Sequence, residues 1–527
     1  MTTDRTRRPA GPVLPVVCLS LATVVSAVVS LNVALPDMAR DTGATLTELS
    51  WIIDAYALVF AALLLPGGAL GDRFGRRRAL IGGLALFAAT ASAALFVDSP
   101  TALIGVRALL GLGAAVIMPA TLSTITATFD EADRVKGVAV WTGVAGASAI
   151  LGLFASGLVM EWWSWRSVFA LSVLLALVSL VATAMVVPES ADPEHASRDP
   201  FGGLLSAAGM GMVVFSLIEA PTHGWTSGRT LVGIAVGLAL LGAFALWELT
   251  RERPLLDPRH FAQAAFAGGT LSITVQFFTF FGFIYLLLQY FQLVLDLSPL
   301  EAAVRMLPLP LGLMPAARLS PHLVPRLGQA RLCGLGLGVI ALGMLGFTQV
   351  DAGTSYGWVA ALLWPLGLGM GLAMTPATTA ITDALPAAEQ GVASAVNDLA
   401  RELGGALGIA VLASVMTSSY RSALALPGAL PEQARQLARD SFAAATQLPA
   451  PVPQLARDAF MTGMHDATRV ASVVVACVGA VIVTMLARAA RRSAAAQEAT
   501  EVRDGEGHRS SLGGEDEPLL DEPVPGR

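Results

Sequence analysis

Long uninterrupted apolar segments alternate along this chain with short polar connections. Each segment holds about 20 residues, the length of α-helix that crosses the roughly 30 Å hydrocarbon core of a bilayer. The pattern predicts an all-α polytopic membrane protein with fourteen transmembrane helices. We expect these spans near residues 13–35, 49–70, 79–96, 101–121, 137–160, 167–187, 201–219, 230–249, 266–292, 302–323, 332–350, 356–379, 391–416 and 468–486.

Two segments interrupt the apolar pattern. Residues 417–467 are rich in Ala, Pro and Gln with scattered charges, and we expect them to form an external loop. Residues 493–527 carry Glu, Asp, Gly and Ser with almost no large apolar side chain. That composition is typical of disorder, because too little apolar surface is available for burial. The sequence therefore predicts a disordered acidic tail.

Composition agrees with this interpretation. The 527 residues are 54% hydrophobic and 14% charged, whereas a soluble protein carries about 25% charged residues. Cys18, Cys333 and Cys477 lie far apart, and none of the six histidines shares a ligand-type spacing with them. We therefore expect no disulfide framework, no metal site and no cofactor.

Lysine usage excludes one source of energy. Lys136 is the only lysine among 33 basic residues, and Gly137 follows it. A phosphate-binding P-loop requires G-x-x-x-x-G-K-[ST], which is therefore missing. No nucleophile or cofactor constellation stands out either, so we expect neither an enzyme nor a nucleic-acid partner. Heavy use of Ala, Gly and Arg indicates a high-GC bacterial genome.

The basic residues also predict an orientation. Connections after even-numbered spans carry most of the Arg and Lys, beginning with four arginines at residues 73–78. Connections that keep positive charge stay in the cytoplasm. We therefore expect a multi-pass protein of the bacterial plasma membrane with both termini cytoplasmic.

The connection between the second and third spans carries the most specific motif. It reads Gly68-Ala-Leu-Gly-Asp72-Arg-Phe-Gly75-Arg-Arg-Arg. This run resembles, position for position, the cytoplasmic signature G-x-L-x-D-R-x-G-R-R of the major facilitator superfamily. The resemblance implies two six-helix bundles related by a parallel repeat. The degenerate copy Leu323-Val-Pro-Arg-Leu-Gly-Gln-Ala-Arg331 agrees with such a repeat.

The superfamily fold accounts for twelve of the fourteen spans. The remaining pair, at residues 201–249, lies between the two bundles and is expected to form an inserted hairpin. The predicted parts are an N-terminal cytoplasmic tail, an N-terminal bundle, the hairpin with its flanking loops, a C-terminal bundle and the acidic tail. They occupy residues 1–12, 13–187, 188–260, 261–492 and 493–527.

Five further runs resemble the fourteen-helix drug:proton antiporter family. They are Leu31-Asn-Val-Ala-Leu-Pro36, Trp51-Ile-Ile-Asp54-Ala-Tyr56, Leu103-x-x-x-Arg107-x-x-x-Gly111, Gly391-Val-Ala-Ser-Ala-Val-Asn397 and Arg401-Glu-Leu-Gly-Gly-Ala-Leu-Gly408. The resemblance implies a secondary active transporter that exports hydrophobic drugs or antibiotics in exchange for protons. Its partners would be a lipophilic small molecule, protons and the lipid bilayer, and we expect a monomer.

The chain departs from this family at two positions. Family members often carry an aspartate five residues before the asparagine of the first span, where this chain has Ala27. Their fifth span normally contains Gly-Pro, where this chain has Gly152-Leu153 and so lacks a helix-kinking proline. The first departure removes a usual proton site, and the second weakens the inference of antiport.

Asp54 is the candidate proton carrier. A carboxylate inside a membrane span is costly unless it is paired or protonated. Asp54 and Arg107 lie five and six residues into spans that both enter from outside, and hence at similar depth. We hypothesise that Arg107 holds Asp54 ionised in one state and releases it to a proton in the other. A static salt bridge, or a solvated Asp54 without a role, are the alternatives.

The signature loop is the candidate conformational latch. We expect Asp72 to dock on the N-terminus of the thirteenth span, which offers free N–H groups and a partial positive charge. Asp398 and Glu402 are expected to meet Arg73 or Arg76. The alternative is that the arginines only fix topology. The latch residues are Gly68, Asp72, Arg73, Gly75, Arg76, Asp398, Arg401 and Glu402.

The ninth span combines aromatic rings with a few amides, which suits a large lipophilic substrate. The alternative is that these rings face lipid or neighbouring helices. The candidate substrate path consists of Asn32, Tyr56, Gln276, Phe280 and Gln289. Two other functions remain open, a dedicated exporter of one self-made metabolite and a proton-coupled importer of a small solute.

Overall fold

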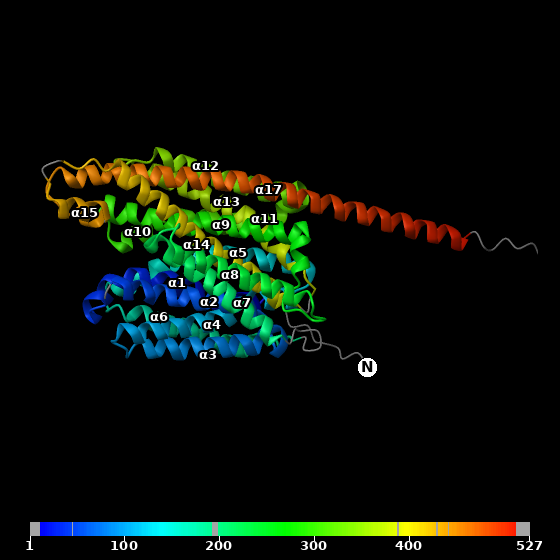
Figure 1. Cartoon of the computed structure of the whole chain (residues 1–527). Coiled ribbons are helices and arrows are strands. Elements are labelled where there is room, and N and C mark those ends of the chain that lie inside the picture. The colour runs from blue at the N-terminus through cyan, green and yellow to red at the C-terminus, as the bar shows by residue number, and fades with distance from the viewer. Residues whose placement is uncertain are drawn as a thin grey trace, which may run out of the picture.

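The computed structural model describes residues 11–44, 46–191, 199–386, 389–427, 430–440 and 442–512. These residues form helices joined by short connections (Figure 1). The helices are α1 (Val13–Thr42), α2 (Leu46–Phe74), α3 (Arg76–Ala94), α4 (Pro100–Thr128), α5 (Glu131–Met160), α6 (Ser167–Val186), α7 (Pro200–His223), α8 (Gly228–Glu248), α9 (Ala264–Gln289), α10 (Pro299–Arg305), α11 (Pro308–Leu327), α12 (Gln329–Gly346), α13 (Tyr356–Thr382), α14 (Gln390–Ala423), α15 (Glu432–Asp440), α16 (Phe442–Ala445) and α17 (Val452–Leu512). Three short helical turns, Pro258–Ala262, Tyr290–Val294 and Phe347–Gln349, complete the set in the described chain.

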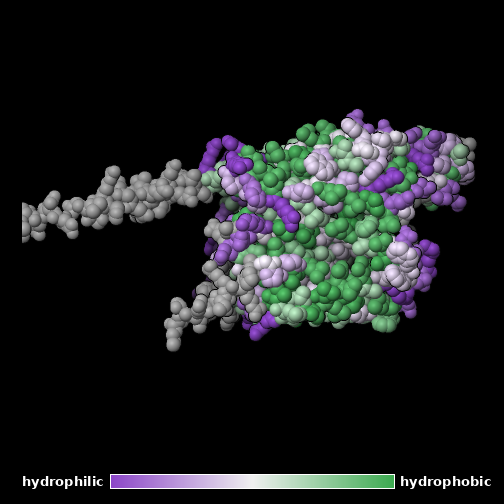
Figure 2. Space-filling model, turned by 180° about the vertical axis from the view of Figure 1, so that it is seen from behind, coloured by the Kyte–Doolittle hydropathy of each residue, from purple (hydrophilic) through white to green (hydrophobic). Residues whose placement is uncertain are grey.

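Twelve helices in the described part of the chain are long and apolar enough to cross a membrane. Helices α3 and α11 also coincide with predicted spans but are not among the twelve. The first turn of α3 holds three arginines, and α11 contains Pro315, Pro321 and Pro325. Both lie alongside the other helices in the bundle (Figure 1). An apolar belt covers the middle of the bundle, with polar residues at its two ends (Figure 2).

The two halves of the bundle repeat the same helix pairings. In the N-terminal half, α1 packs on α5, α2 on α4, and α3 on both α4 and α6. In the C-terminal half, α9 packs on α14, α11 on α13, and α12 on both α13 and α17. The halves meet where α2 packs on α14 and where α5 packs on α11. This correspondence is the internal repeat that the signature loop indicates.

Helices α7 and α8 form a hairpin between the two halves in sequence. They pack on each other, and α7 also packs on α2 and α14. Close packing within the hairpin depends on Gly237, because a Cβ there would lie 2.7 Å from a Val213 methyl carbon and 2.9 Å from the Val213 nitrogen. The hairpin therefore lies against the seam between the halves.

Several helices extend beyond their predicted spans, and three further differences change how a segment is assigned. The predicted span 302–323 is divided between the short α10 and α11, because Pro308 cannot donate a backbone hydrogen bond. The predicted external loop 417–467 is shorter, since α14 continues to Ala423 and α17 begins at Val452. Helix α17 also continues to Leu512, through part of the predicted disordered tail. The run Ser493-Ala-Ala-Ala-Gln-Glu-Ala consists mostly of good helix formers. Residues 513–527 lie outside the described chain.

Candidate functional site

Asp72, at the end of α2, caps the first turn of α14. Its carboxylate accepts hydrogen bonds from the backbone N–H of Gly391, at 3.0 and 2.8 Å, and of Val392, at 3.3 Å. Arg76 also donates to it at 2.6 Å, and both side chains are buried. The first N–H groups of a helix have no acceptor within the helix and carry a partial positive charge. We call this set of bonds the latch contact.

Two glycines allow the helices to approach at the latch contact. A Cβ at Gly68 would overlap the carbonyl oxygen of Gly391, and a Cβ at Gly391 would overlap both Gly68 and the Asp72 carboxylate. Gly75 ends the turn with φ of 108°, a conformation that L side chains rarely adopt. A side chain at Gly75 would also meet the carboxylate of Glu189. The glycines of the motif therefore have a steric basis.

The structure brings only part of the predicted latch together. Arg73 is exposed and lies beside the ring of Phe74, 5.0 Å from its centre. Asp398 and Glu402 do not meet Arg73 or Arg76, since they begin about 10 Å further along α14 than Gly391. The expected contacts of these two carboxylates are therefore wrong in this conformation.

Asp398 and Arg401 instead form a separate buried cluster at the boundary between the halves. The Nε of Arg401 lies 3.9 Å from the Asp398 carboxylate. Its guanidinium group stacks over the ring of Trp141 from α5, at 4.5 Å, and over Phe277 from α9, at 5.0 Å. Cation–π contacts of this kind are stronger when water is excluded.

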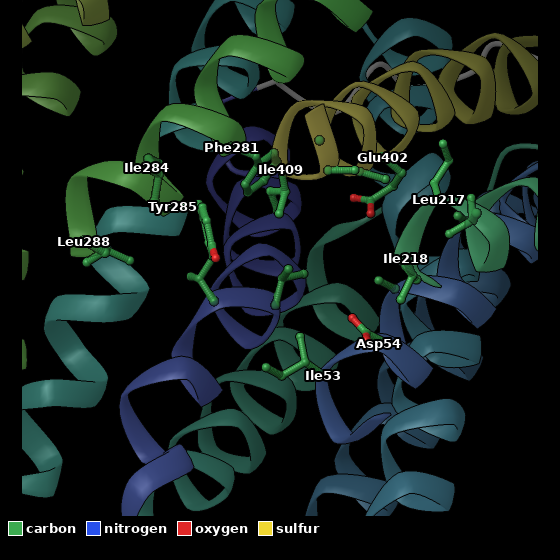
Figure 3. A pocket seen from close by; sticks show the side chains of 18 of the residues that line it. Ile53, Asp54, Leu217, Ile218, Phe281, Ile284, Tyr285, Leu288, Glu402 and Ile409 are labelled. Atoms are coloured by element: carbon green, nitrogen blue, oxygen red, sulfur yellow. The ribbon is translucent and has the colours of Figure 1, made fainter. Parts of the chain in front are cut away.

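A central cavity of about 300 Å³ lies between the halves and the hairpin. Helices α1, α2, α5, α7, α9 and α14 supply its walls. Most of the lining is aliphatic or aromatic, and Phe281 and Tyr285 are among it. Two carboxylates, Asp54 and Glu402, also face it (Figure 3). On α2, Asp54 lies about 27 Å from Asp72, so the cavity is in the half of the bundle remote from the latch contact.

Neither cavity carboxylate makes a hydrogen bond or ion pair with any residue that the structure describes. Both are partly buried, on α2 and α14 respectively. An ionised carboxylate in apolar surroundings is costly without a partner. Asp54 and Glu402 are therefore suited to accept a proton or to bind a cation that enters the cavity.

The predicted ion pair between Asp54 and Arg107 is not formed among the described contacts. Arg107 is buried, and its Nε donates to the carbonyl of Ile52 at 2.9 Å. Its Nη1 donates to the carbonyl of Ala27 at 3.2 Å, and the guanidinium lies 4.4 Å from the ring centre of Tyr56. Because Ala27 offers no carboxylate, the main chain supplies the acceptors. The contact with Ile52 still places Arg107 beside the turn that carries Asp54.

The predicted substrate path does not coincide with the central cavity. Tyr56 is buried beneath Arg107, and its hydroxyl lies 3.4 Å from the Val24 carbonyl. Gln276 donates to the carbonyl and hydroxyl of Ser272, at 3.1 and 3.0 Å. Gln276 and Phe280 line a much smaller cavity among α9, α11, α12 and α13. Phe280 also lines a second small cavity together with Phe281 and Glu402, which are residues of the central cavity wall.

Two path residues remain. Gln289 is not in the wall of the central cavity, which on this helix is formed by residues 281, 284, 285 and 288. The side chain of Asn32 lies outside the described part of the chain. Phe281 and Tyr285 belong to the aromatic residues of the ninth span but are not among the residues of the predicted path. They lie four positions apart and so share one helical face. Their spacing was the available signal, but α9 is apolar all round, so its inward face is not evident from the sequence.

Comparisons with known proteins identify the family. The model of the Major Facilitator Superfamily matches residues 17–409. The structure is also similar to the human organic anion transporter MFSD10 (TETRAN), with a TM-score of 0.62, 14% identity and coverage of 91% of this chain and 100% of that chain. The proton:xylose symporter XylE gives 0.59 and 14%, covering 91% and 95%. The protein belongs to the major facilitator superfamily and is a multi-pass membrane transporter.

Three curated relatives are similar to this chain in sequence. The methyl viologen resistance protein SmvA of Salmonella typhimurium is 35% identical over 62% of this chain and 66% of its own length. The multidrug efflux pump LfrA of Mycolicibacterium smegmatis is 35% identical over 65% and 68%. The tetracenomycin C resistance and export protein of Streptomyces glaucescens is 30% identical over 68% and 67%. The chain thus spans about two thirds of the length of these relatives.

Proposed function

We propose that the protein exports lipophilic compounds across the bacterial plasma membrane in exchange for protons. The observation that carries this proposal is the central cavity, in which Asp54 and Glu402 face an otherwise apolar lining. Apolar walls with a few polar groups favour a drug-sized lipophilic ligand. The two carboxylates further favour ligands that carry positive charge. The names of the relatives, which include a multidrug efflux pump, support export.

The proposal includes the full architecture expected from the sequence. Helices α3 and α11 would cross the membrane with the other twelve, giving fourteen spans. The end of the bundle with the latch contact would face the cytoplasm, because it carries the arginines of residues 73–78. Helix α1 begins and α17 extends at this same end (Figure 1), which supports cytoplasmic termini.

The arrangement supports alternating access by the two halves. The latch contact closes one end of the bundle, while the cavity lies in the other half of the membrane. A cavity carboxylate that exchanges a proton for a cationic cargo would couple the entry of protons to the exit of cargo. If Asp54 and Glu402 each carry one proton, two protons enter for each monovalent cation that leaves. One net charge then moves inward, which supplies about 2.3 kcal/mol per 100 mV. That free energy sustains a cargo gradient of roughly fiftyfold.

A dedicated exporter of one self-made metabolite is the second candidate. The relative named as a tetracenomycin C resistance and export protein favours it. Both candidates predict the same direction and the same coupling, and they differ in the breadth of cargo. Import of a polar solute is disfavoured, because the cavity wall provides few hydrogen-bonding groups.

Transport by purified protein in liposomes tests the proposal. Vesicles loaded with ethidium or methyl viologen would be exposed to an imposed pH gradient, with and without an uncoupler. We expect cation movement that depends on the pH gradient and that the uncoupler abolishes. Vesicles without the protein should not show it. Cation movement that is the same with and without the gradient would contradict proton exchange.

A further inference from the structure

The inserted hairpin contacts both halves of the transporter. The rings of Trp51 on α2 and Phe215 on α7 lie 5.8 Å apart. At the turn between α7 and α8, the indole nitrogen of Trp225 donates to the hydroxyl of Ser414 on α14 at 2.7 Å. The hairpin is therefore attached on both sides of the seam and not only joined to the halves by its loops.

One face of α7 forms a wall of the central cavity. Val214, Leu217 and Ile218 line it, and their spacing of three and four positions places them on one helical face. Figure 3 shows Leu217 and Ile218 on one side of the cavity and Tyr285 on the other. Met212 belongs to a different face of the same helix and is 37% exposed at the outer surface.

Polar contacts hold α7 in a defined position relative to α8. The carboxylate of Glu219 lies 3.2 Å from Arg229 and 3.2 Å from the ring nitrogen of His223. Arg229 also lies within 3.1 Å of the other ring nitrogen of His223. Glu219 follows Ile218 directly, so this network restrains the turn that carries the cavity residues.

The walls of the cavity differ in chemistry. The carboxylates come from α2 and α14, one helix from each half, whereas α7 contributes three aliphatic side chains. We propose that α7 is a specificity wall, which sets the largest cross-section of cargo that fits opposite Phe281 and Tyr285. This inference rests on the proposed function, because it assumes that cargo occupies the central cavity. The hairpin then takes part in the selection of cargo.

Enlarging one wall residue tests this idea. The variant Ile218→Phe adds a ring to the wall, and Met212→Phe adds the same ring to the outer face of α7 as a matched control. Binding of methyl viologen, which is small, and of rhodamine 6G, which is bulky, would be measured on each purified full-length protein without a gradient. Ile218→Phe should weaken rhodamine 6G binding by about tenfold or more, since the added ring occupies space that a bulky ligand needs.

The same variant should leave methyl viologen binding within about twofold, and Met212→Phe should leave both cations unchanged. A second variant, Leu217→Ala, enlarges the cavity and should shift selectivity toward rhodamine 6G, so the test survives if Ile218→Phe fails to fold. Equal losses for both cations, or equal effects of the two Phe variants, would overturn the specificity wall.

Binding and transport separate this inference from the proposed function. If the α7 variants change binding according to cargo size, but transport does not depend on the pH gradient, proton exchange is contradicted and the specificity wall is supported. If the pH gradient drives transport of both cations, but the α7 variants do not change binding, proton exchange is supported and the specificity wall is contradicted. Failure of the wild-type protein to bind either cation would overturn the wall as a cargo contact.

Discussion

The latch contact and the central cavity place carboxylates of the helix bundle in opposite situations. Asp72 accepts bonds from two backbone N–H groups and from Arg76. Asp54 and Glu402 have no hydrogen-bond or ion-pair partner among the described residues. The three side chains belong to the same two helices, α2 and α14. Their difference therefore comes from position along the helices and not from the elements that carry them.

The comparison shows how one pair of helices can supply both a fixed contact and an exchangeable site. A buried pair with satisfied lone pairs is costly to break, about 3–5 kcal/mol when one partner is removed. Such a contact stabilises one conformation. A carboxylate without a partner in an apolar cavity gains when a proton or a cation reaches it. It can therefore respond to what enters the cavity.

The largest effect, a loss of transport, is expected when the carboxylates of the cavity are replaced by amides. Asp54→Asn should abolish pH-driven cation transport, and Glu402→Gln should reduce cation binding and transport strongly, because neither amide can take up a proton or pair with a cation. Gradient-driven flux in liposomes, normalised to the amount of protein, measures this. Glu432→Gln is the matched control, since Glu432 is 75% exposed on α15 and should tolerate the change. Wild-type flux in Asp54→Asn would remove Asp54 from the mechanism.

The second largest effect is expected from a change at the latch contact, and it concerns the balance between conformations. Asp72→Asn removes the buried ion pair with Arg76 and weakens the cap of α14. The conformation in which the latch contact is closed should lose about 3 kcal/mol relative to the conformation in which this end is open. Arg78→Gln is the control, because the side chain of Arg78 is 78% exposed.

Distances between spin labels would report this change of population. Labels at Arg73→Cys and Asp383→Cys, in a Cys477→Ser background, would follow the separation of α2 from the α13–α14 turn. We expect a longer distance to be populated in Asp72→Asn and not in Arg78→Gln. An unchanged distance distribution in the Asp72 variant would show that the contact does not hold this end closed.

A smaller effect is expected from adding one methyl group at the latch contact. Gly68→Ala places a Cβ against the carbonyl of Gly391, and backbone on both sides leaves little room to adjust. Overpacking of this kind costs about 1–3 kcal/mol. Gly82→Ala on α3 is the matched control, because a Cβ there would have nothing within 4 Å. Equal transport rates for the two variants would show that α2 and α14 need not approach this closely.

The smallest effect is expected from an exposed carboxylate. Asp133 pairs with Lys136 at 3.0 Å, and its side chain is 58% exposed. Asp133→Asn should change the free energy of unfolding by less than about 0.5 kcal/mol, because solvent screens such pairs. Thermal unfolding in detergent measures it. A loss of about 3–5 kcal/mol, the size expected when a buried pair is broken, would show that exposure does not weaken this pair.

The latch contact illustrates what the sequence determines by itself. Segment length and hydropathy locate the helices, because about 20 apolar residues are needed to cross the bilayer. The motif from Gly68 to Arg76 specifies a turn, a cap and close packing within nine positions. Those functions depend on neighbours in the sequence and on one helix N-terminus, at Gly391. The docking of Asp72 could therefore be predicted, although the contacts of Asp398 and Glu402 could not.

The central cavity shows what only the tertiary structure decided. Asp54 and Glu402 face one space because α2 and α14 pack across the boundary between the halves, and α7 closes a side of it. Helices that are apolar all round carry no periodic signal for rotation about their axes. The sequence therefore left open whether Gln276 or Tyr285 faces the cavity, and whether Arg107 meets Asp54 or the carbonyl of Ala27. Packing between distant segments fixed these choices.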